Sequence, residues 1–327
     1  MITKILLSAF LFILYACNSG TTYQGPVNDP LVKTDSAANQ ISILTYNVKA
    51  IVEKDSSASN ELIRYVNKQL FDFVIFQELF SENSRTYLNS RIDSLFYKQR
   101  IPRIDYESFP QNIFQDSGLF FLSHYPQISL DTIDFGPEIS QSNGYVYAPL
   151  KKEISITMDF IVNKSIMGSL HSLKDGNLVF LFATHLQAIG SETHKEIQLL
   201  QIRSFIEYTI RKAIQSGIIL NPENCIVLLS GDFNLDAYEN LTYLSLLENL
   251  GNPRDLHKEF HKENKEYSII FKGINMQKRF DYIFAYDKLG IYTFKKVSVQ
   301  SINITDVQDR QNNSISDHFA MKAALRY

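Results

Sequence analysis

A carboxylate and a carboxamide, two residues apart, end one of the most apolar stretches of this sequence. The stretch runs from Cys225 to Ser230, and Gly231 then leads into Asp232 and Asn234. Such a run predicts a strand that is buried on both faces. Alternate side chains of an extended backbone point the same way, so both polar groups are expected to enter one space at a carboxyl strand end, where open sheets bind ligands. Gly-Asp-x-Asn is also ordinary turn chemistry, so this segment alone does not establish a site.

Other predicted strands begin or end with side chains of the same chemical types. These residues are Asn47, Glu78, His185, Asp281, Asp317 and His318. Each of them alone is explained well as a cap, a turn residue or an exposed strand edge. The whole set, with its mixture of carboxylates, amides and imidazoles, indicates that these strand ends form one site.

The first elements that must position these residues form a β-α-β unit. Residues 41–46 and 73–77 are predicted strands, and a helix capped by Ser59 or Asn60 lies between them. A strand, a helix and a strand in close succession place the two strands in parallel. Their carboxyl ends are therefore expected at the same edge of a sheet.

The rest of the chain alternates between strands and helices without internal repeats, which indicates one layered domain. A long helix is predicted from a cap at Ser191 to a stop at Gly217, and a shorter one over 241–250. The other predicted strands cover 106–109, 118–123, 145–150, 165–170, 178–184, 281–286, 294–301 and 318–325.

Six short motifs resemble those of the endonuclease/exonuclease/phosphatase superfamily, and most of all its neutral sphingomyelinase branch. In chain order they are Thr45-Tyr46-Asn47, Gln77-Glu78, Thr184-His185-Leu186, Gly231-Asp232-Phe233-Asn234, Asp281-Tyr282-Ile283 and Ser316-Asp317-His318. The resemblance implies an α/β (α+β) fold, a four-layer α/β/β/α sandwich of two packed mixed sheets. The site is expected at one edge of the two sheets.

The resemblance and the side-chain chemistry together imply metal-dependent hydrolysis of a phosphodiester, which needs an activated water and stabilised phosphate charge. Glu78 is the expected main ligand of Mg²⁺, with Mn²⁺ or Ca²⁺ as alternatives. Asn47 is expected to contact metal-bound water or the phosphate, and Asp317 to reach the metal directly or through water. His185 is expected to donate to a phosphate oxygen, and Asn234 to position the attacking water or bind the phosphate.

The general base has two candidates. A histidine held by a carboxylate has a fixed tautomer and a raised proton affinity, and His318 oriented by Asp281 fits this description. The sphingomyelinase-like members of the superfamily favour the histidine. Asp232 is the alternative, either as the proton acceptor or as the group that orients the water.

Three details favour a phospholipid head group as the substrate over DNA. Gln187-Ala188 after the histidine motif, the segment 118–126, and Asn163-Lys164 are similar to neutral sphingomyelinases, although Ser165 stands where they have glycine. The expected activity is a sphingomyelinase-like phospholipase C. A metal-dependent nuclease, or a small-molecule phosphodiesterase or phosphatase, is the alternative, and a non-enzymatic ligand-binding lipoprotein is a weaker third hypothesis. The interval between the last two motifs contains no clear aromatic wedge for a bilayer.

The amino terminus resembles a bacterial lipoprotein signal. Residues 1–16 form the expected signal peptide, and Cys17 is the expected site of lipidation. Residues 17–40 then form a lipidated, flexible tether, and 41–327 the catalytic domain. We expect a monomer anchored in the cell envelope of a bacterium, in the periplasm or at the outer-membrane surface.

Charge and composition narrow the alternatives. The formal net charge is -3, which gives no broad basic field for nucleic acid, and Cys17 and Cys225 are the only cysteines. Neither a cysteine-rich zinc site nor a disulfide framework is possible. His257 and His261 have helical i, i+4 spacing in a Lys- and Glu-rich stretch, and we interpret them as a solvated surface.

Overall fold

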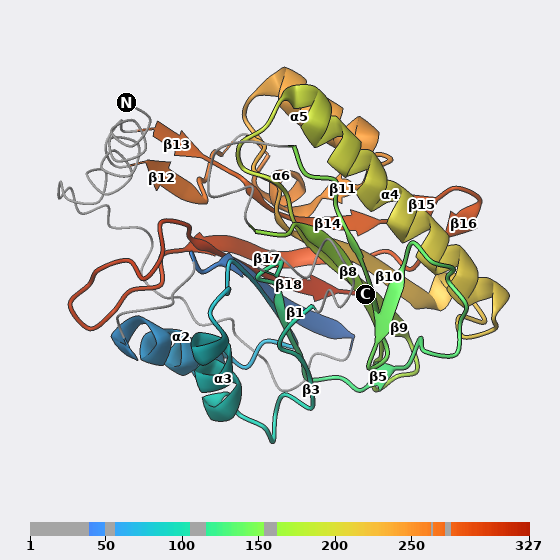
Figure 1. Ribbon diagram of the computed structural model, residues 1–327, viewed down its shortest axis with the longest axis horizontal. Coiled ribbons are helices and arrows are strands. Elements are labelled where there is room, and N and C mark those ends of the chain that lie inside the picture. Colours follow the sequence, from blue (N-terminus) through green and yellow to red (C-terminus); the bar gives the residue numbers. More distant parts are fainter. Residues whose placement is uncertain (1–38, 50–55, 105–115, 154–161, 263, 272–275) are drawn as a thin grey trace, which may run out of the picture.

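The computed structural model describes residues 39–49, 56–104, 116–153, 162–262, 264–271 and 276–327 (Figure 1). The predicted signal peptide, Cys17, nearly all of the tether and the predicted strand 106–109 lie outside the described residues. Within the described ranges, no helix is both long and apolar enough to cross a membrane.

Two mixed sheets form the middle of the molecule (Figure 1). The six-stranded sheet has the order β17-β18-β1-β2-β4-β3, with β1 (Gln40–Asn47), β2 (Phe73–Gln77), β3 (Gln99–Ile101), β4 (Phe120–Ser123), β17 (Ser298–Thr305) and β18 (Ala320–Arg326). The eight-stranded sheet has the order β11-β14-β10-β9-β8-β7-β6, with β5 paired to β8. Its strands are β5 (Gln127–Ile128), β6 (Ser140–Ser142), β7 (Tyr145–Pro149), β8 (Ser165–Ser172), β9 (Leu178–His185), β10 (Cys225–Asp232), β11 (Arg254–Asp255) and β14 (Asp281–Tyr286).

Strands β1 and β10 are buried on both faces, and one face of each lies in the layer between the sheets. Ile41 and Ile43 of β1 lie in one buried cluster with Ile226 and Leu228 of β10. Successive side chains of a strand point to opposite faces, so every second residue contributes to this inner layer. The main core therefore lies between the two sheets.

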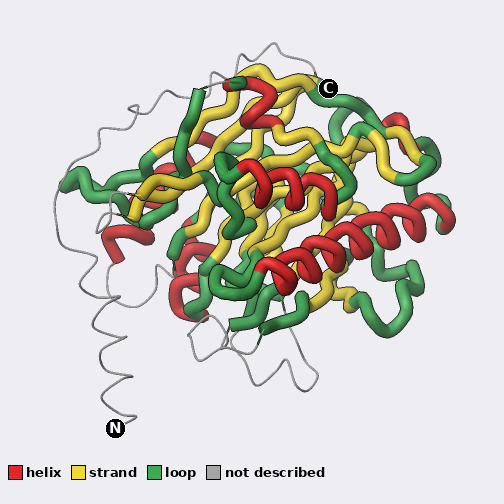
Figure 2. The backbone as a smooth tube through the Cα atoms, turned by 90° about the horizontal axis from the view of Figure 1, so that it is seen from above, coloured by secondary structure: helices red, strands yellow, loops and turns green. Residues whose placement is uncertain are grey.

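The other faces of both sheets are covered by helices. These helices are α2 (Ser56–Gln69), α3 (Glu82–Arg91), α4 (Glu192–Gln215) and α5 (Asn240–Asn249). The short helix α6 (Leu256–His261) instead packs Leu256 into the cluster between the sheets, and η3 (Pro222–Asn224) is a 3₁₀ turn. Leu44 of β1 packs in a cluster with Leu62 of α2, and Val227 of β10 in one with Ile202 of α4. Figure 2 shows α4 lying along the sheet. The predicted four-layer sandwich is confirmed.

Helix boundaries were predicted with mixed success. The Ser191 side chain accepts a hydrogen bond from the backbone N–H of His194 and caps α4, and Gly217 follows the helix at a φ of 78°. Helix α2 begins at Ser56, so Ser59 lies inside the helix and the predicted cap is wrong. Helix α3 was missed because its sequence is mostly polar and shows no apolar stripe.

The last strands also start later than predicted. Strand β17 begins at Ser298, and Phe294 and Val297 lie in the preceding loop although both are buried. Their apolar character had suggested a strand that starts earlier. Two small hairpins complete the described fold, β12 (Ile269–Phe271) with β13 (Met276–Lys278), and β15 (Lys288–Leu289) with β16 (Tyr292–Thr293). The β12 strand touches the site, since Ile269 bridges to His318 ahead of β18.

Candidate active site

The strand register brings the predicted residues together. In the six-stranded sheet, Asn47 at the end of β1 lies beside Gln77 at the end of the parallel strand β2, and Glu78 follows. In the eight-stranded sheet, Asp232 at the end of β10 pairs with His185 on one side and with Asp281 on the other. Polar residues from both sheets therefore meet at one edge of the sandwich, as the motifs predicted.

Asn47 connects the two sheets. Its Nδ2 donates to Asp232 Oδ2 at 2.9 Å and to Glu78 Oε1 at 3.1 Å. Asn47 and Asp232 are buried, whereas 28% of the Glu78 side chain is exposed. The carboxamide thus holds two carboxylates at a fixed separation, and only Glu78 of the three faces partly outward.

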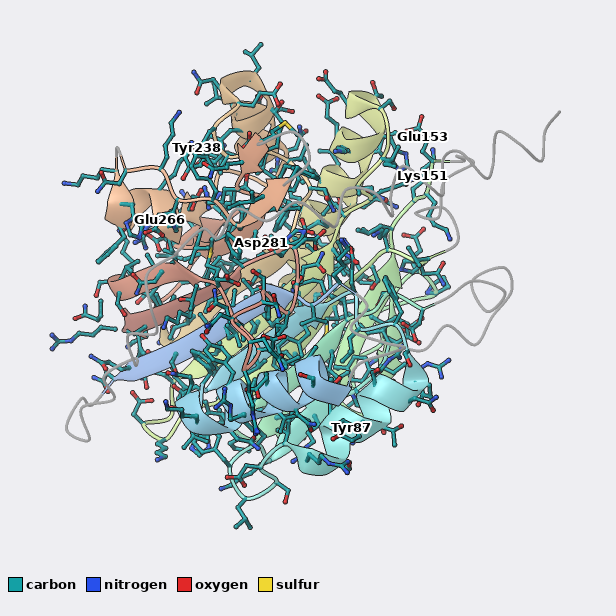
Figure 3. All side chains as sticks on the ribbon, turned by 90° about the vertical axis from the view of Figure 1, so that its left-hand side faces the viewer. Tyr87, Lys151, Glu153, Tyr238, Glu266 and Asp281 are labelled. Carbon is teal, nitrogen blue, oxygen red and sulfur yellow. The ribbon has the colours of Figure 1, made fainter. Side chains whose placement is uncertain are left out.

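Asp281 and His318 form a buried dyad. His318 Nδ1 lies 2.9 Å from Asp281 Oδ2, and its Nε2 lies 3.6 Å from Asp232 Oδ2. Ser316 fixes the backbone of His318, because its Oγ accepts the N–H of His318 at 3.2 Å and donates to the carbonyl of Asn47 at 2.8 Å. The imidazole is therefore oriented by Asp281 and presents its other nitrogen to Asp232 (Asp281 is labelled in Figure 3).

The charges of this group are coupled. Although burial opposes it, the carboxylates of Asp281 and Asp232 raise the pKa of His318. Burial raises the pKa of Asp232, while His318 works in the opposite direction. A proton at the site therefore belongs to the Asp232–His318 pair rather than to either residue alone.

His185 is kept neutral. Its Nε2 lies 3.7 Å from both Glu78 Oε1 and Asp232 Oδ2. Burial lowers the pKa of His185 well below its usual value, and Lys164 and His318 lower it further. Lys164 Nζ lies 3.3 and 3.4 Å from the two ring nitrogens of His185. A neutral imidazole retains one N–H that can donate to a phosphate oxygen.

Asn234 departs from the geometry that strand alternation predicted. Strand β10 ends at Asp232, and Asn234 has a φ of 51°, so the two side chains do not continue one extended backbone. The backbone N–H of Asn234 donates to Asp232 Oδ1 at 2.8 Å, and its Nδ2 donates to the carbonyl of Leu186 at 3.0 Å. Asn234 therefore lies beside Asp232 through a tight turn.

Backbone constraints are concentrated at these strand ends. Glu78 also has a positive φ, 58°, which non-glycine residues rarely adopt. Gly231 has a φ of 151°, and a Cβ there would lie 1.9 Å from the carbonyl oxygen of Thr184. Only glycine allows β10 to approach β9 this closely, and this approach sets Asp232 beside His185.

The donor set fits a divalent cation. Glu78 offers a partly exposed carboxylate, and Asp281 Oδ1 and Asp317 Oδ1 are buried without a hydrogen-bond partner in the described structure. Asp232, Asp281 and His318 also have ligand atoms within 4.8 Å of one another. Hard carboxylate oxygens suit Mg²⁺, so the residues present are compatible with the expected metal.

Two predicted metal contacts have other partners in this conformation. Asn47 turns its nitrogen toward the carboxylates, while its Oδ1 accepts the backbone N–H of Lys49 at 2.9 Å. Asp317 Oδ2 forms an ion pair with Lys49 Nζ at 2.6 Å. Sequence reasoning did not identify Lys49 as a site residue, and it noted Lys164 only as part of a motif. Lys49 contacts Asp317 and Lys164 contacts His185, and a local sequence pattern does not predict contacts between residues so far apart in the chain.

Comparisons with known proteins give the fold and little beyond it. No family model matches the chain, and no curated protein does. Solved structures of the same fold include an endonuclease/exonuclease/phosphatase from Bacteroides vulgatus, which is 16% identical, with a TM-score of 0.59 and coverage of 88% of this chain and 99% of that one. The chain thus has the fold of the endonuclease/exonuclease/phosphatase proteins, as its motifs predicted.

Three further structures of this fold differ in what they bind or act on. Sphingomyelinase C from Streptomyces griseocarneus is 17% identical, with a TM-score of 0.57 and coverage of 88% and 99%. A mutant of beta toxin from Staphylococcus aureus with bound magnesium ions is 18% identical, with a TM-score of 0.57 and coverage of 87% and 99%. D. rerio TDP2 complexed with a single-strand DNA product is 18% identical, with a TM-score of 0.57 and coverage of 88% and 99%.

Proposed function

We propose that this protein is a metal-dependent phosphodiesterase, and more narrowly a sphingomyelinase-like phospholipase C that releases a phosphorylated head group. One observation carries the proposal: the Asp281–His318 dyad faces Asp232, and Asn47 joins Asp232 to the partly exposed Glu78. Burying ionisable groups is costly, so carboxylates and imidazoles gather in a protein interior where they pair with one another or take part in chemistry.

The residues present can carry the steps of hydrolysis. Water attacks phosphorus, its proton passes to the Asp232–His318 pair, and the P–O bond to the leaving alcohol breaks as that oxygen regains a proton from the pair. Asp281 keeps His318 in the tautomer that this transfer needs. We assign His185 as the donor to a non-bridging phosphate oxygen, which its lowered pKa supports, and Asn234 as the residue that holds the water or the phosphate.

Glu78 is the residue that we assign as the main ligand of Mg²⁺, with Asp317 and Asn47 near it. When bound, the cation supplies neutralisation of phosphate charge and acidification of a water. Magnesium in the beta toxin structure of the same fold supports the choice of metal. The preference of Mg²⁺ for one or two carboxylates with retained waters supports Glu78 as its ligand.

The phospholipid assignment is supported by the neutral sphingomyelinase motifs and by the shared fold of Sphingomyelinase C. Gln187, one of those motif residues, makes structural hydrogen bonds. Its Oε1 accepts the backbone N–H of Glu153 at 3.0 Å, and its own backbone N–H donates to Gln198 Oε1. It therefore fixes the segment before residue 154 rather than reading a head group. DNA is the alternative substrate, which the TDP2 complex supports.

A substrate panel tests this proposal. The purified protein is incubated with Mg²⁺ and, in separate assays, sphingomyelin vesicles, plasmid DNA or bis(4-nitrophenyl) phosphate. The His124→Ala variant, which is altered outside the site, is assayed in the same way as a control. Release of phosphocholine from the vesicles supports the lipid assignment. Nicking of DNA without lipid turnover would move the function to the nuclease class on the same fold.

We also propose that Cys17 carries a lipid anchor and that residues 17–40 tether the catalytic domain to the cell envelope of a bacterium. The apolar segment before Cys17 and the polar composition after it support this proposal. An anchor at the envelope would keep a monomeric enzyme near lipid substrates.

A further inference from the structure

A second cluster of metal-binding side chains lies on and after helix α6. His257 and His261 are one helical turn apart on α6, and Glu266 follows five residues later. The sequence interpretation of a solvated surface is wrong here, because 1% of the His257 side chain and 13% of the His261 side chain are exposed. The ligand atoms of the two histidines and of Glu266 lie within 4.8 Å of one another (Glu266 is labelled in Figure 3).

The three side chains converge on one carboxylate oxygen. His257 Nε2 lies 3.1 Å from Glu266 Oε2, and His261 Nε2 lies 3.6 Å from the same oxygen. The two imidazole rings are 4.4 Å apart between centroids and inclined by 32°. Residues four apart on a helix share a face, which explains how so short a helix brings both imidazoles to Glu266.

These separations match what a shared zinc ion requires. Zn²⁺ binds histidine nitrogen and carboxylate oxygen at about 2.0–2.2 Å in tetrahedral geometry, which sets neighbouring ligand atoms roughly 3.3 Å apart. The observed distances of 3.1 and 3.6 Å bracket this value. A ligand set of two imidazoles and one carboxylate also binds first-row transition metals in preference to Mg²⁺.

We propose that His257, His261 and Glu266 form a structural zinc site, with water as the fourth ligand. The site is separate from the residues assigned to phosphodiester chemistry, and it rests on none of their roles. Without metal, His261 Nε2 donates to the carbonyl of Ile302 at 2.8 Å. Zinc takes the place of that proton, so the bond to Ile302 is exchanged for a metal bond.

The site has a structural consequence for the dyad. Glu266 lies two residues before Ser268, whose Oγ accepts the backbone N–H of Asp281 at 3.2 Å. The carbonyl of Ser268 accepts the N–H of Phe319, the residue after His318, at 2.6 Å. A metal that ties Glu266 to α6 therefore fixes the segment that holds Asp281 and His318 in register.

Zinc titration of the purified full-length protein tests the site. The reference protein carries His318→Ala, because Asp232, Asp281 and His318 form the other described group that could take a metal. After EDTA treatment and removal of the chelator, zinc binding is measured by calorimetry in the reference, and in the reference with His261→Ala or Glu266→Gln. His124→Ala in the same background is the matched histidine control, since His124 stacks on Phe96 and belongs to neither cluster.

We expect the reference and the His124→Ala variant to bind zinc equally. Each of the two ligand substitutions should weaken zinc binding by at least about 100-fold, as loss of a direct ligand costs at least as much as loss of a supporting one. Zinc should also raise the melting temperature of the reference and leave that of His261→Ala unchanged. Zinc affinity that both substitutions leave intact, or no zinc binding by the reference, would overturn the proposal. The metal-free melting temperatures of all variants show whether each one is folded.

Discussion

At the scale of single residues, the site is organised by the charge interaction of His318 with two carboxylates. His318 is held by Asp281 at 2.9 Å and faces Asp232 at 3.6 Å, and both carboxylates raise its pKa. The two candidates for the general base are therefore not independent. A substitution at either position changes the proton affinity of the other, and their effects on rate are not expected to add.

The first prediction concerns this pair. His318→Ala should lower kcat by roughly 10³-fold, in the range that general acid–base catalysis contributes. Asp232→Asn should lower it by a similar factor, and the double variant should be only slightly slower than either single variant. Steady-state kinetics with a phosphodiester substrate measure this. Multiplicative losses in the double variant would mean that the two residues act separately.

Sequence reasoning reached most of this site because strand ends are locally recognisable. Asp232 and His185 were found at the end of an apolar segment and Asp281 at the start of one, and the register of β9, β10 and β14 brings them together. The orientation of Asn234 was wrong because the strand ends two residues earlier. The buried pairing of His257 with Glu266 was also missed, since a charged sequence gives no sign of which side chains a distant element will cover.

At the scale of elements, the approach of β10 to β9 is the tightest constraint on the site. Gly231→Ala would place a Cβ 1.9 Å from the carbonyl oxygen of Thr184, so the strands would have to separate. We expect a loss of at least about 3 kcal/mol in the free energy of unfolding. Gly290→Ala is the matched control, because Gly290 has a φ of 59° with no atom within 4 Å of its Cβ, and should cost only about 1 kcal/mol. Equal losses in urea denaturation would contradict this reasoning.

The strand β8 contains a buried histidine that makes stability depend on pH. Burial lowers the pKa of His171 to about 4, and its Nδ1 contacts the carbonyl of Tyr125 at 3.3 Å. In the unfolded chain the pKa is about 6.5, so between these values the unfolded state binds a proton that the folded state does not. Stability should therefore fall as the pH drops from about 6.5 to 4, by up to about 3 kcal/mol from this residue.

The variant His171→Phe isolates that contribution, since the ring already packs against Phe73 and Phe121. Its unfolding free energy should fall less steeply between pH 7 and pH 5 than that of the unmodified protein, whatever its absolute stability. Denaturation at several pH values measures both slopes. Parallel slopes would show that His171 does not titrate on unfolding.

Elements were predictable where the sequence has an apolar run or an apolar stripe, and uncertain elsewhere. Strands β9 and β10 were found because each is an apolar run that is buried along almost its whole length, and the long helix α4 because its buried residues recur with a helical period. Helix α3 and helix α6 were not, because tertiary contacts rather than an apolar stripe hold them. Arg85 of α3, for instance, is buried by an ion pair with Asp116 at 2.5 Å.

At the scale of the whole molecule, the sandwich explains why a site forms where six distant segments meet. Two sheets packed through one core present their strand ends at a common edge, and Asn47 links them there. The order of the motifs was enough to predict this fold. The fold does not identify the substrate, because it is shared by proteins that act on DNA and on sphingomyelin.

The proposed anchor makes a prediction about the intact protein. In bacterial cells, the protein should fractionate with membranes, and Cys17→Ser should move most of it to the soluble fraction while its activity in extracts persists. Mass spectrometry of the amino terminus would show the lipid on Cys17. Unchanged membrane association of Cys17→Ser, or an unmodified Cys17, would contradict lipid anchoring without affecting the catalytic proposal.

The most direct measurement is the dependence of turnover on metal and on Glu78. The unmodified protein and Glu78→Gln are assayed on sphingomyelin vesicles, plasmid DNA and bis(4-nitrophenyl) phosphate, with Mg²⁺, with EDTA, and with Mg²⁺ restored. We predict turnover of at least one substrate with Mg²⁺, its loss in EDTA, its recovery on adding Mg²⁺, and a loss of at least about 100-fold in Glu78→Gln. Turnover that survives EDTA and Glu78→Gln, or none at all from the folded protein, would contradict a metal-dependent phosphodiesterase centred on Glu78.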